Sequence, residues 1–268
     1  MKDVTFGQYY PAKSFVHNMD ARAKIVLTIA YIVAVFLARS LNFLALAPCL
    51  AFLLIAIIAS RVSLLKILKS IKAVIFFVIL SAILQVFFNR EGTPLWEGGF
   101  ITDIGLYNAG FIALRITLVV MGASMLTYTT TPIELSDGIE SLLYPLKWIK
   151  FPVHEFALIM SIALRFIPTL LDETDRIMKA QKARGSDFES GNIFKKAKAL
   201  IPVLIPLLIS SFRRADELAD AMDARCYAGS KKRTRYKKLK FSYRDLIGLI
   251  LTAGLIAGVV LLNGVVLL

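Results

Sequence analysis

Five apolar stretches alternate with polar segments along the chain and predict membrane-spanning helices. A helix needs about 17–25 mostly apolar residues to cross the hydrocarbon core of a bilayer. The first stretch has only 14 residues, so this span must borrow flanking residues or cross a thinned region. We expect an all-α membrane protein with about five transmembrane helices. The stretches are residues 25–38, 43–59, 73–88, 105–128 and 246–268.

The region between the fourth and fifth spans has a different pattern. Residues 153–184 and 193–226 each begin apolar and finish charged, with a helical pattern throughout. A hydropathy window would identify the apolar half of the first segment as a span, but Glu155, Arg165 and Pro168 interrupt it. We expect two long helices that pack on each other at the cytoplasmic face of the membrane. The alternative is that both segments cross the membrane, which gives seven spans.

These two predicted helices have nearly the same ending. The first finishes with Ala183, Arg184 and Gly185, and the second with Ala224, Arg225 and Cys226. In both, an Asp lies nine residues before the Arg, an aliphatic residue seven before it, and Ala four and one before it. One arginine at a helix C-terminus needs no explanation beyond the helix dipole. The repeat of the whole pattern predicts that both arginines dock on a partner.

The second ending departs from the first at its last residue. A glycine after a helix takes a left-handed conformation at no steric cost, and Cys226 stands in that place. Either the helix continues to a cap at Gly229, or Cys226 adopts a mildly strained turn.

Composition and charge agree with a membrane protein and predict its orientation. Hydrophobic residues make up 57% of the 268 residues, against about 45–50% apolar content in soluble domains. The net charge of +13 is attributed to cytoplasmic loops rich in Lys and Arg, and not to nucleic-acid binding. The loop 61–72 carries four basic residues and no acid, whereas the loop 89–103 is net −2. We therefore expect the N-terminus and loop 61–72 inside the cell and loop 89–103 outside.

The same rule assigns the rest of the chain. Seven of the ten residues 231–240 are basic, and we interpret this run as the cytoplasmic flank of the last span, not as a site for RNA or acidic lipid. The predicted organisation is a membrane part with four spans (1–128), cytoplasmic coupling helices (129–240) and a final transmembrane helix (241–268).

Candidate chemistry is sparse. The sequence contains no Gly-x-x-x-x-Gly-Lys-Ser/Thr loop, no metal-ligand cluster and no Gly-x-Ser-x-Gly motif, so we expect no catalytic residue, no cofactor and no metal. Arg115 lies near the middle of the fourth span, where a charge costs at least about 2.5–3.5 kcal/mol. It either belongs to a transport path or partner contact, or it bonds to backbone carbonyls or to Asn108. The sequence leaves these alternatives open.

A polar motif precedes the first span. Ser14, His17, Asp20, Arg22 and Lys24 follow the spacing Ser-x-x-His-x-x-Asp-x-Arg-x-Lys. Asp20 is expected to cap the first helix, and Arg22 and Lys24 to lie at the headgroup level. His17 has no ligand-type residue at metal-binding spacing, so we expect a structural, interfacial histidine.

This motif and the two helix endings together resemble the transmembrane T component of energy-coupling factor (ECF) transporters, over nearly the whole chain. The resemblance implies an L-shaped bundle of membrane helices with long coupling helices. Each coupling helix of that family ends in Ala-Arg-Gly, which inserts into a groove of one ABC-type ATPase subunit (A or A'). Ala183, Arg184 and Gly185 match in full, whereas the second copy ends in Cys226 where glycine is usual.

The resemblance also implies a function. The chain would be a non-enzymatic scaffold in the prokaryotic cell membrane, in contact with two cytoplasmic ATPase subunits and with a membrane S component that binds substrate. It would couple ATP hydrolysis to uptake of vitamins or transition-metal ions. The alternatives are a stand-alone secondary carrier with Arg115 in its path, a membrane-embedded enzyme, and a permease of a conventional ABC importer.

Overall fold

The computed structural model describes most of the chain, and its secondary structure there is helical. The described residues are 9–39, 42–72, 74–89, 93, 102–149, 152–186, 188, 192–227, 229 and 241–265. The basic run 231–240, and most of the acidic loop 89–103, lie outside them. The helical content confirms the predicted all-α fold class.

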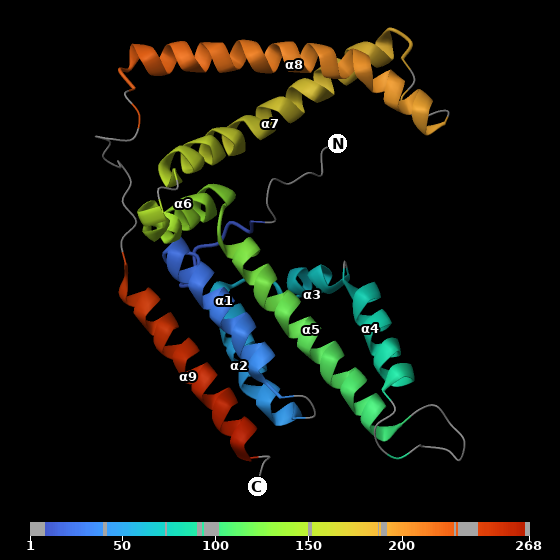
Figure 1. Ribbon diagram of the computed structural model, residues 1–268, viewed down its shortest axis with the longest axis vertical. Helices are drawn as coiled ribbons and strands as arrows, with labels where there is room; N and C mark the ends of the chain where they lie inside the picture. Colours follow the sequence, from blue (N-terminus) through green and yellow to red (C-terminus); the bar gives the residue numbers. More distant parts are fainter. Residues whose placement is uncertain are drawn as a thin grey trace. The chain divides into compact units, whose positions relative to one another are not determined.

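The chain divides into two compact units (Figure 1). The helical bundle contains Gly7–Leu142 and Leu239–Leu268, and the paired-helix unit contains Leu143–Lys238. The bundle holds α1 (Ala21–Leu37), α2 (Phe43–Ser60), α3 (Leu64–Lys72), α4 (Ile75–Phe88), α5 (Asp103–Thr129), α6 (Pro132–Leu143) and α9 (Tyr243–Val265). The paired-helix unit holds the 3-10 helix η1 (Tyr144–Ile149), α7 (Val153–Ala183) and α8 (Ile193–Ala224).

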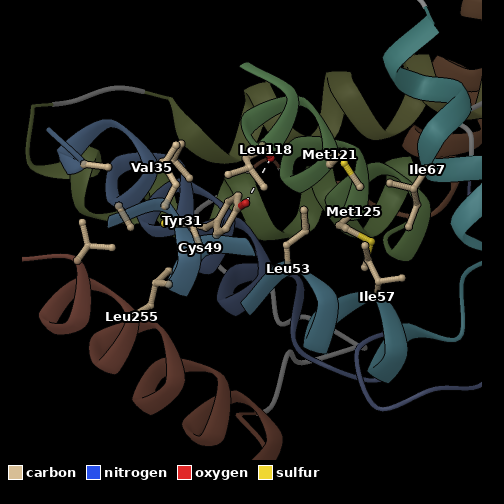
Figure 2. Close-up of a cluster of buried hydrophobic side chains, with 14 of the residues drawn as sticks. Tyr31, Val35, Cys49, Leu53, Ile57, Ile67, Leu118, Met121, Met125 and Leu255 are labelled. Carbon is tan, nitrogen blue, oxygen red and sulfur yellow. Dashed lines mark hydrogen bonds between the residues drawn. The ribbon is translucent and has the colours of Figure 1, made fainter. Parts of the chain in front are cut away.

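Close packing of aromatic and aliphatic side chains forms the core of the bundle (Figure 2). Tyr31 of α1 is 2% exposed, and its hydroxyl donates to the carbonyl oxygen of Leu118 in α5 at 3.4 Å. The ring fits because α5 has a glycine opposite it. A Cβ added at Gly122 would lie 2.3 Å from Cε1 of Tyr31, so any larger residue there would separate α1 from α5.

Three helices in the described residues are long and apolar enough to cross a bilayer: α2, α5 and Tyr243–Gly264 of α9. The pair α3 and α4 gives a fourth candidate if the two are one span bent by 60°. The helix α1 has 17 residues, about 26 Å, and is short, as its apolar stretch predicted. The molecule is thus an all-α membrane protein.

The prediction of a loop at residues 61–72 is wrong, because most of this segment is the helix α3. Its apolar residues Leu64, Ile67, Leu68 and Ile71 recur at the spacing i, i+3, i+4, i+7 that places them on one helical face. The prediction of a loop rested on the charge of the four basic residues and not on this apolar period.

The two long helices predicted after the fourth span are confirmed. The helices α7 and α8 have 31 and 32 residues, and each continues through its internal prolines. They cross one another (Figure 1), with the Gln181 amide nitrogen 3.4 Å from the Pro202 carbonyl oxygen. Glu173, earlier in α7 than Gln181, contacts Ser210 and Arg214, which come later in α8 than Pro202. The two helices therefore run antiparallel.

Candidate functional site

The first helix ending is a Schellman motif, a pair of backbone hydrogen bonds that closes a helix C-terminus. The N–H of Gly185 donates to the Lys182 carbonyl at 3.0 Å, and the N–H of Ser186 donates to the Gln181 carbonyl at 3.0 Å. Gly185 has a φ of +88°, in the left-handed region. Arg184 is the C-cap residue, and its side chain is exposed.

The second ending has the same geometry without the glycine. Cys226 has a φ of +56° and donates to the Asp223 carbonyl at 2.8 Å, while Tyr227 donates to the Met222 carbonyl at 3.1 Å. The helix therefore ends at Ala224 and does not continue to Gly229. Of the two alternatives for Cys226, the structure has the strained turn, at a cost of about 1–2 kcal/mol for an L-residue.

Arg184 and Arg225, at the two helix endings, lie at opposite ends of the paired helices. The carboxylate of Glu173 accepts a hydrogen bond from the Ser210 hydroxyl at 2.5 Å and forms an ion pair with Arg214. Arg184 lies eleven residues beyond Glu173, and Arg225 lies eleven residues beyond Arg214. At about 1.5 Å of rise per residue, each is about 16 Å from the ion pair. Because the helices are antiparallel, the two arginines lie on opposite sides of the ion pair, up to about 33 Å apart.

Sequence reasoning did not identify Glu173 and Arg214 as a joint between the helices. The only available signal was that they lie 41 residues apart, the same offset that relates the two endings. Their side chains are 21% and 29% exposed, so the pair is partly shielded from solvent.

The N-terminal motif forms a second polar site, which we call the N-terminal polar cluster: Tyr10, Ser14, His17, Asp20, Lys24, Thr129 and Asp245. Asp20 is the N-cap of α1, as predicted, and its Oδ1 accepts from the Arg22 N–H at 2.9 Å. Lys24 donates from Nζ to the carbonyls of His17 at 3.0 Å and Thr129 at 2.9 Å. Lys24 is 5% exposed, so its side chain turns inward to these two carbonyls. The Arg22 side chain is half-buried.

His17 joins the N-terminal segment to this cluster. Its Nε2 donates to the Tyr10 carbonyl at 2.9 Å, and its Nδ1 accepts from the Ser14 hydroxyl at 2.7 Å. Burial lowers the pKa of His17, which favours the neutral ring that this pattern of one donor and one acceptor requires. Tyr10 in turn donates its N–H to the Tyr128 carbonyl at 3.0 Å. The hydrogen bonds thus assign His17 the structural position that was expected.

Asp245 completes the cluster, and sequence reasoning missed it. It is fully buried, and its carboxylate accepts from the N–H groups of Asp20 at 2.9 Å and Ser242 at 2.7 Å. The start of α1, the end of α5 and the start of α9 therefore meet at one end of the bundle (Figure 1). The available signal was the capping box Ser242-x-x-Asp245 before an apolar run.

Arg115 caps the opposite end of α1. Its guanidinium donates to the carbonyl of Ala38, the C-cap residue of α1, and lies 4.6 Å from the centre of the Phe111 ring. Asn263 of α9 donates to the adjacent Leu37 carbonyl at 2.8 Å. The last carbonyls of a helix have no donor within the helix and need such partners. This geometry favours a structural arginine over one in a transport path.

Comparison with known proteins finds transporter proteins that are similar over most of the chain. The family model CbiQ, described as a cobalt transport protein, matches residues 12–236. The chain is 51% identical over 250 residues to the energy-coupling factor transporter transmembrane protein EcfT of Clostridium kluyveri, covering 92% of each chain. It is 43% identical over 262 residues to the protein of the same name from Bacillus subtilis, covering 96% of this chain and 98% of the relative.

Proposed function

The chain belongs to the family of energy-coupling factor transporter transmembrane proteins, and we propose that it couples two cytoplasmic ATPase subunits to a substrate-binding S component. As a member of that family it is a non-catalytic membrane subunit of a transporter. The proposal goes further, because it assigns the docking residues, the partners and the transmission of motion. The observation that carries it is the identical cap at the two helix endings.

Arg184 and Arg225 are the proposed docking residues. Each follows the last turn of a helix, and the left-handed residue after it turns the chain away, so the guanidinium remains exposed at the helix tip. Its five N–H donors form a planar fork suited to carboxylates and backbone carbonyls in a groove. Ala183 and Ala224 are small enough for close approach to a partner surface.

Two docking sites require two grooves, and the geometry supports one on each ATPase subunit. The arginines lie up to about 33 Å apart and on opposite sides of the Glu173–Arg214 ion pair. A single groove would not hold both. Closure of two ATPase subunits on ATP would change the separation of their grooves, and the joined α7 and α8 would then move together.

The S component would receive this motion through the membrane part of the chain and would select the substrate, a vitamin or a transition-metal ion. In this proposal the N-terminus and the paired helices are cytoplasmic. The charge pattern supports this orientation, because residues 172–198 carry seven Lys or Arg against five Asp or Glu.

Charge reversal at both arginines tests the docking proposal. The double variant R184E/R225E, co-expressed with the ATPase subunits, should lose them on affinity purification, because two carboxylates would face the acceptors that bound the guanidinium groups. The matched control is R176E/R213E, which reverses two exposed arginines on the same helices and should retain the complex. Retention of both ATPase subunits by R184E/R225E, with uptake unchanged, would contradict the proposal.

A further inference from the structure

The helix α3 has a buried side and an exposed side. Ile67 is fully buried and Ile71 half-buried against the core of the bundle. The leucines beside them are instead exposed, by 51% at Leu64, 71% at Leu65 and 49% at Leu68. Lys66, Lys69 and Lys72 are also exposed, and the helical period places Lys69 and Lys72 on either side of Leu65. An apolar face beside a basic face is typical of a helix that lies at a membrane surface.

The geometry of α3 and α4 places this helix near the membrane boundary. The helix α4 has 14 residues, about 21 Å, which falls short of a hydrocarbon core about 30 Å thick. With the bend of 60°, the nine residues of α3 add about 7 Å of height along the direction of α4. The two helices together have about 28 Å of height along this direction, close to the thickness of the core, so α3 runs obliquely at its boundary with the headgroups.

Contacts with the bundle fix α3 at the end that holds the N-terminal polar cluster. The Tyr128 hydroxyl donates to the Lys66 carbonyl at 3.1 Å, and the Lys66 ammonium lies 3.9 Å from the centre of the Tyr10 ring. Lys69 and Lys72 follow on the exposed surface of a segment, 61–72, that contains no acidic residue.

We propose that α3 is a binding site for anionic phospholipid. The phosphate group would lie against Lys69 and Lys72, and an acyl chain would pack along Leu64, Leu65 and Leu68. Positive charge beside exposed leucines is complementary to a lipid with an anionic headgroup, and each basic residue near such a surface strengthens binding by about fivefold. The site is independent of the docking arginines and of the proposed coupling.

Lipid retention by the full-length chain tests the site. The purified protein is equilibrated in micelles with equal amounts of phosphatidylglycerol and phosphatidylcholine, and native mass spectrometry counts the lipids that stay bound. The wild type should prefer phosphatidylglycerol, and K69Q/K72Q should reduce that preference by about 25-fold. The control K195Q/K196Q removes the same charge from α8 and should keep the preference. Equal retention of the two lipids by the wild type, or an equal loss in both variants, would overturn the proposal.

A second measurement distinguishes lipid from a protein partner on the leucine face. A spin label is placed at L65C, with Cys226 changed to serine, in vesicles of phosphatidylcholine and phosphatidylglycerol at three to one. Contact with acyl chains predicts a mobile label that collides readily with oxygen. An immobile label shielded from oxygen would mean that protein covers the face, and the lipid site would be rejected.

Discussion

Cys226 shows how a helix ending can keep its geometry after losing its glycine. The hydrogen bonds around Cys226 repeat those around Gly185 residue for residue, although an L-residue in the left-handed region is strained. Nothing lies within 4 Å of a Cβ added at Gly185, so the environment of the first ending does not itself demand glycine. The penalty at both positions is a matter of backbone conformation alone.

The variant C226G should stabilise the second ending. Relief of about 1–2 kcal/mol of left-handed strain exceeds the extra backbone entropy of glycine, about 0.5–1 kcal/mol. The net gain of roughly 0.5–1 kcal/mol should slow exchange of the Tyr227 amide, which bonds to Met222, by about two- to fivefold. Amide hydrogen exchange followed by mass spectrometry measures this.

The reverse substitution provides the comparison. G185A introduces the same strain at the first ending and should speed exchange of the Ser186 amide, which bonds to Gln181. If C226G left Tyr227 exchange unchanged while G185A accelerated Ser186, strain at Cys226 would not be the physical difference between the endings.

Buried hydrogen bonds join helices that are distant in the sequence. Asp245 at the start of α9 accepts from the N–H of Asp20 at the start of α1, and Lys24 of α1 bonds to the end of α5. These contacts are between residues 225 and 105 positions apart. At the other end of α1, Arg115 and Asn263 bond to its last carbonyls. The short helix α1 is thereby held at both ends by hydrogen bonds with α5 and α9.

The variant D245N should destabilise the bundle. An amide keeps one oxygen, so either the Asp20 or the Ser242 N–H would face an NH₂ group and lose its acceptor, at a cost of about 1–3 kcal/mol. Thermal unfolding of the purified chain in micelles should show a lower midpoint. The control D220N changes an exposed aspartate of α8 and should stay within about 0.5 kcal/mol of wild type. Equal midpoints for the two variants would show that Asp245 is not a structural joint.

The sequence predicted the elements that depend on local pattern. Apolar runs predicted the candidate spans α2, α5 and α9, and the continuous helical period of residues 153–184 predicted α7, because each signal lies within one segment. It did not predict the Glu173–Arg214 pair or the position of Asp245, because each depends on a partner far along the chain. The helix α3 was not predicted for another reason: its basic residues dominate the composition of a short segment in which the leucines and isoleucines recur with a helical period.

At the scale of the molecule, the two units carry different features. The bundle carries the candidate spans, the N-terminal polar cluster and the amphipathic α3. The paired-helix unit carries the two capped arginines and the ion pair between them. The sequence connects the units near residues 142–143 and 238–239. For the proposed coupling, the membrane side on which the connection of α7 to α8 lies is decisive.

Accessibility of position 186, between α7 and α8, decides between five and seven spans. If both helices crossed the membrane, this connection would lie outside the cell. If they are cytoplasmic, S186C should resist a membrane-impermeant maleimide on intact cells and react once the membrane is opened. Cysteine is close in size to serine and keeps the N–H that bonds to Gln181, so the helix ending is preserved.

This labelling test needs a chain without other reactive cysteines and a control position outside the cell. The cells lack the ATPase subunits, and Cys226 is changed to serine because it is exposed whereas Cys49 is buried. T93C, in the predicted external loop, should react in intact cells and is the positive control. Labelling of S186C in intact cells would place the connection outside, and the arginine at the end of α7 could then not reach a cytoplasmic ATPase.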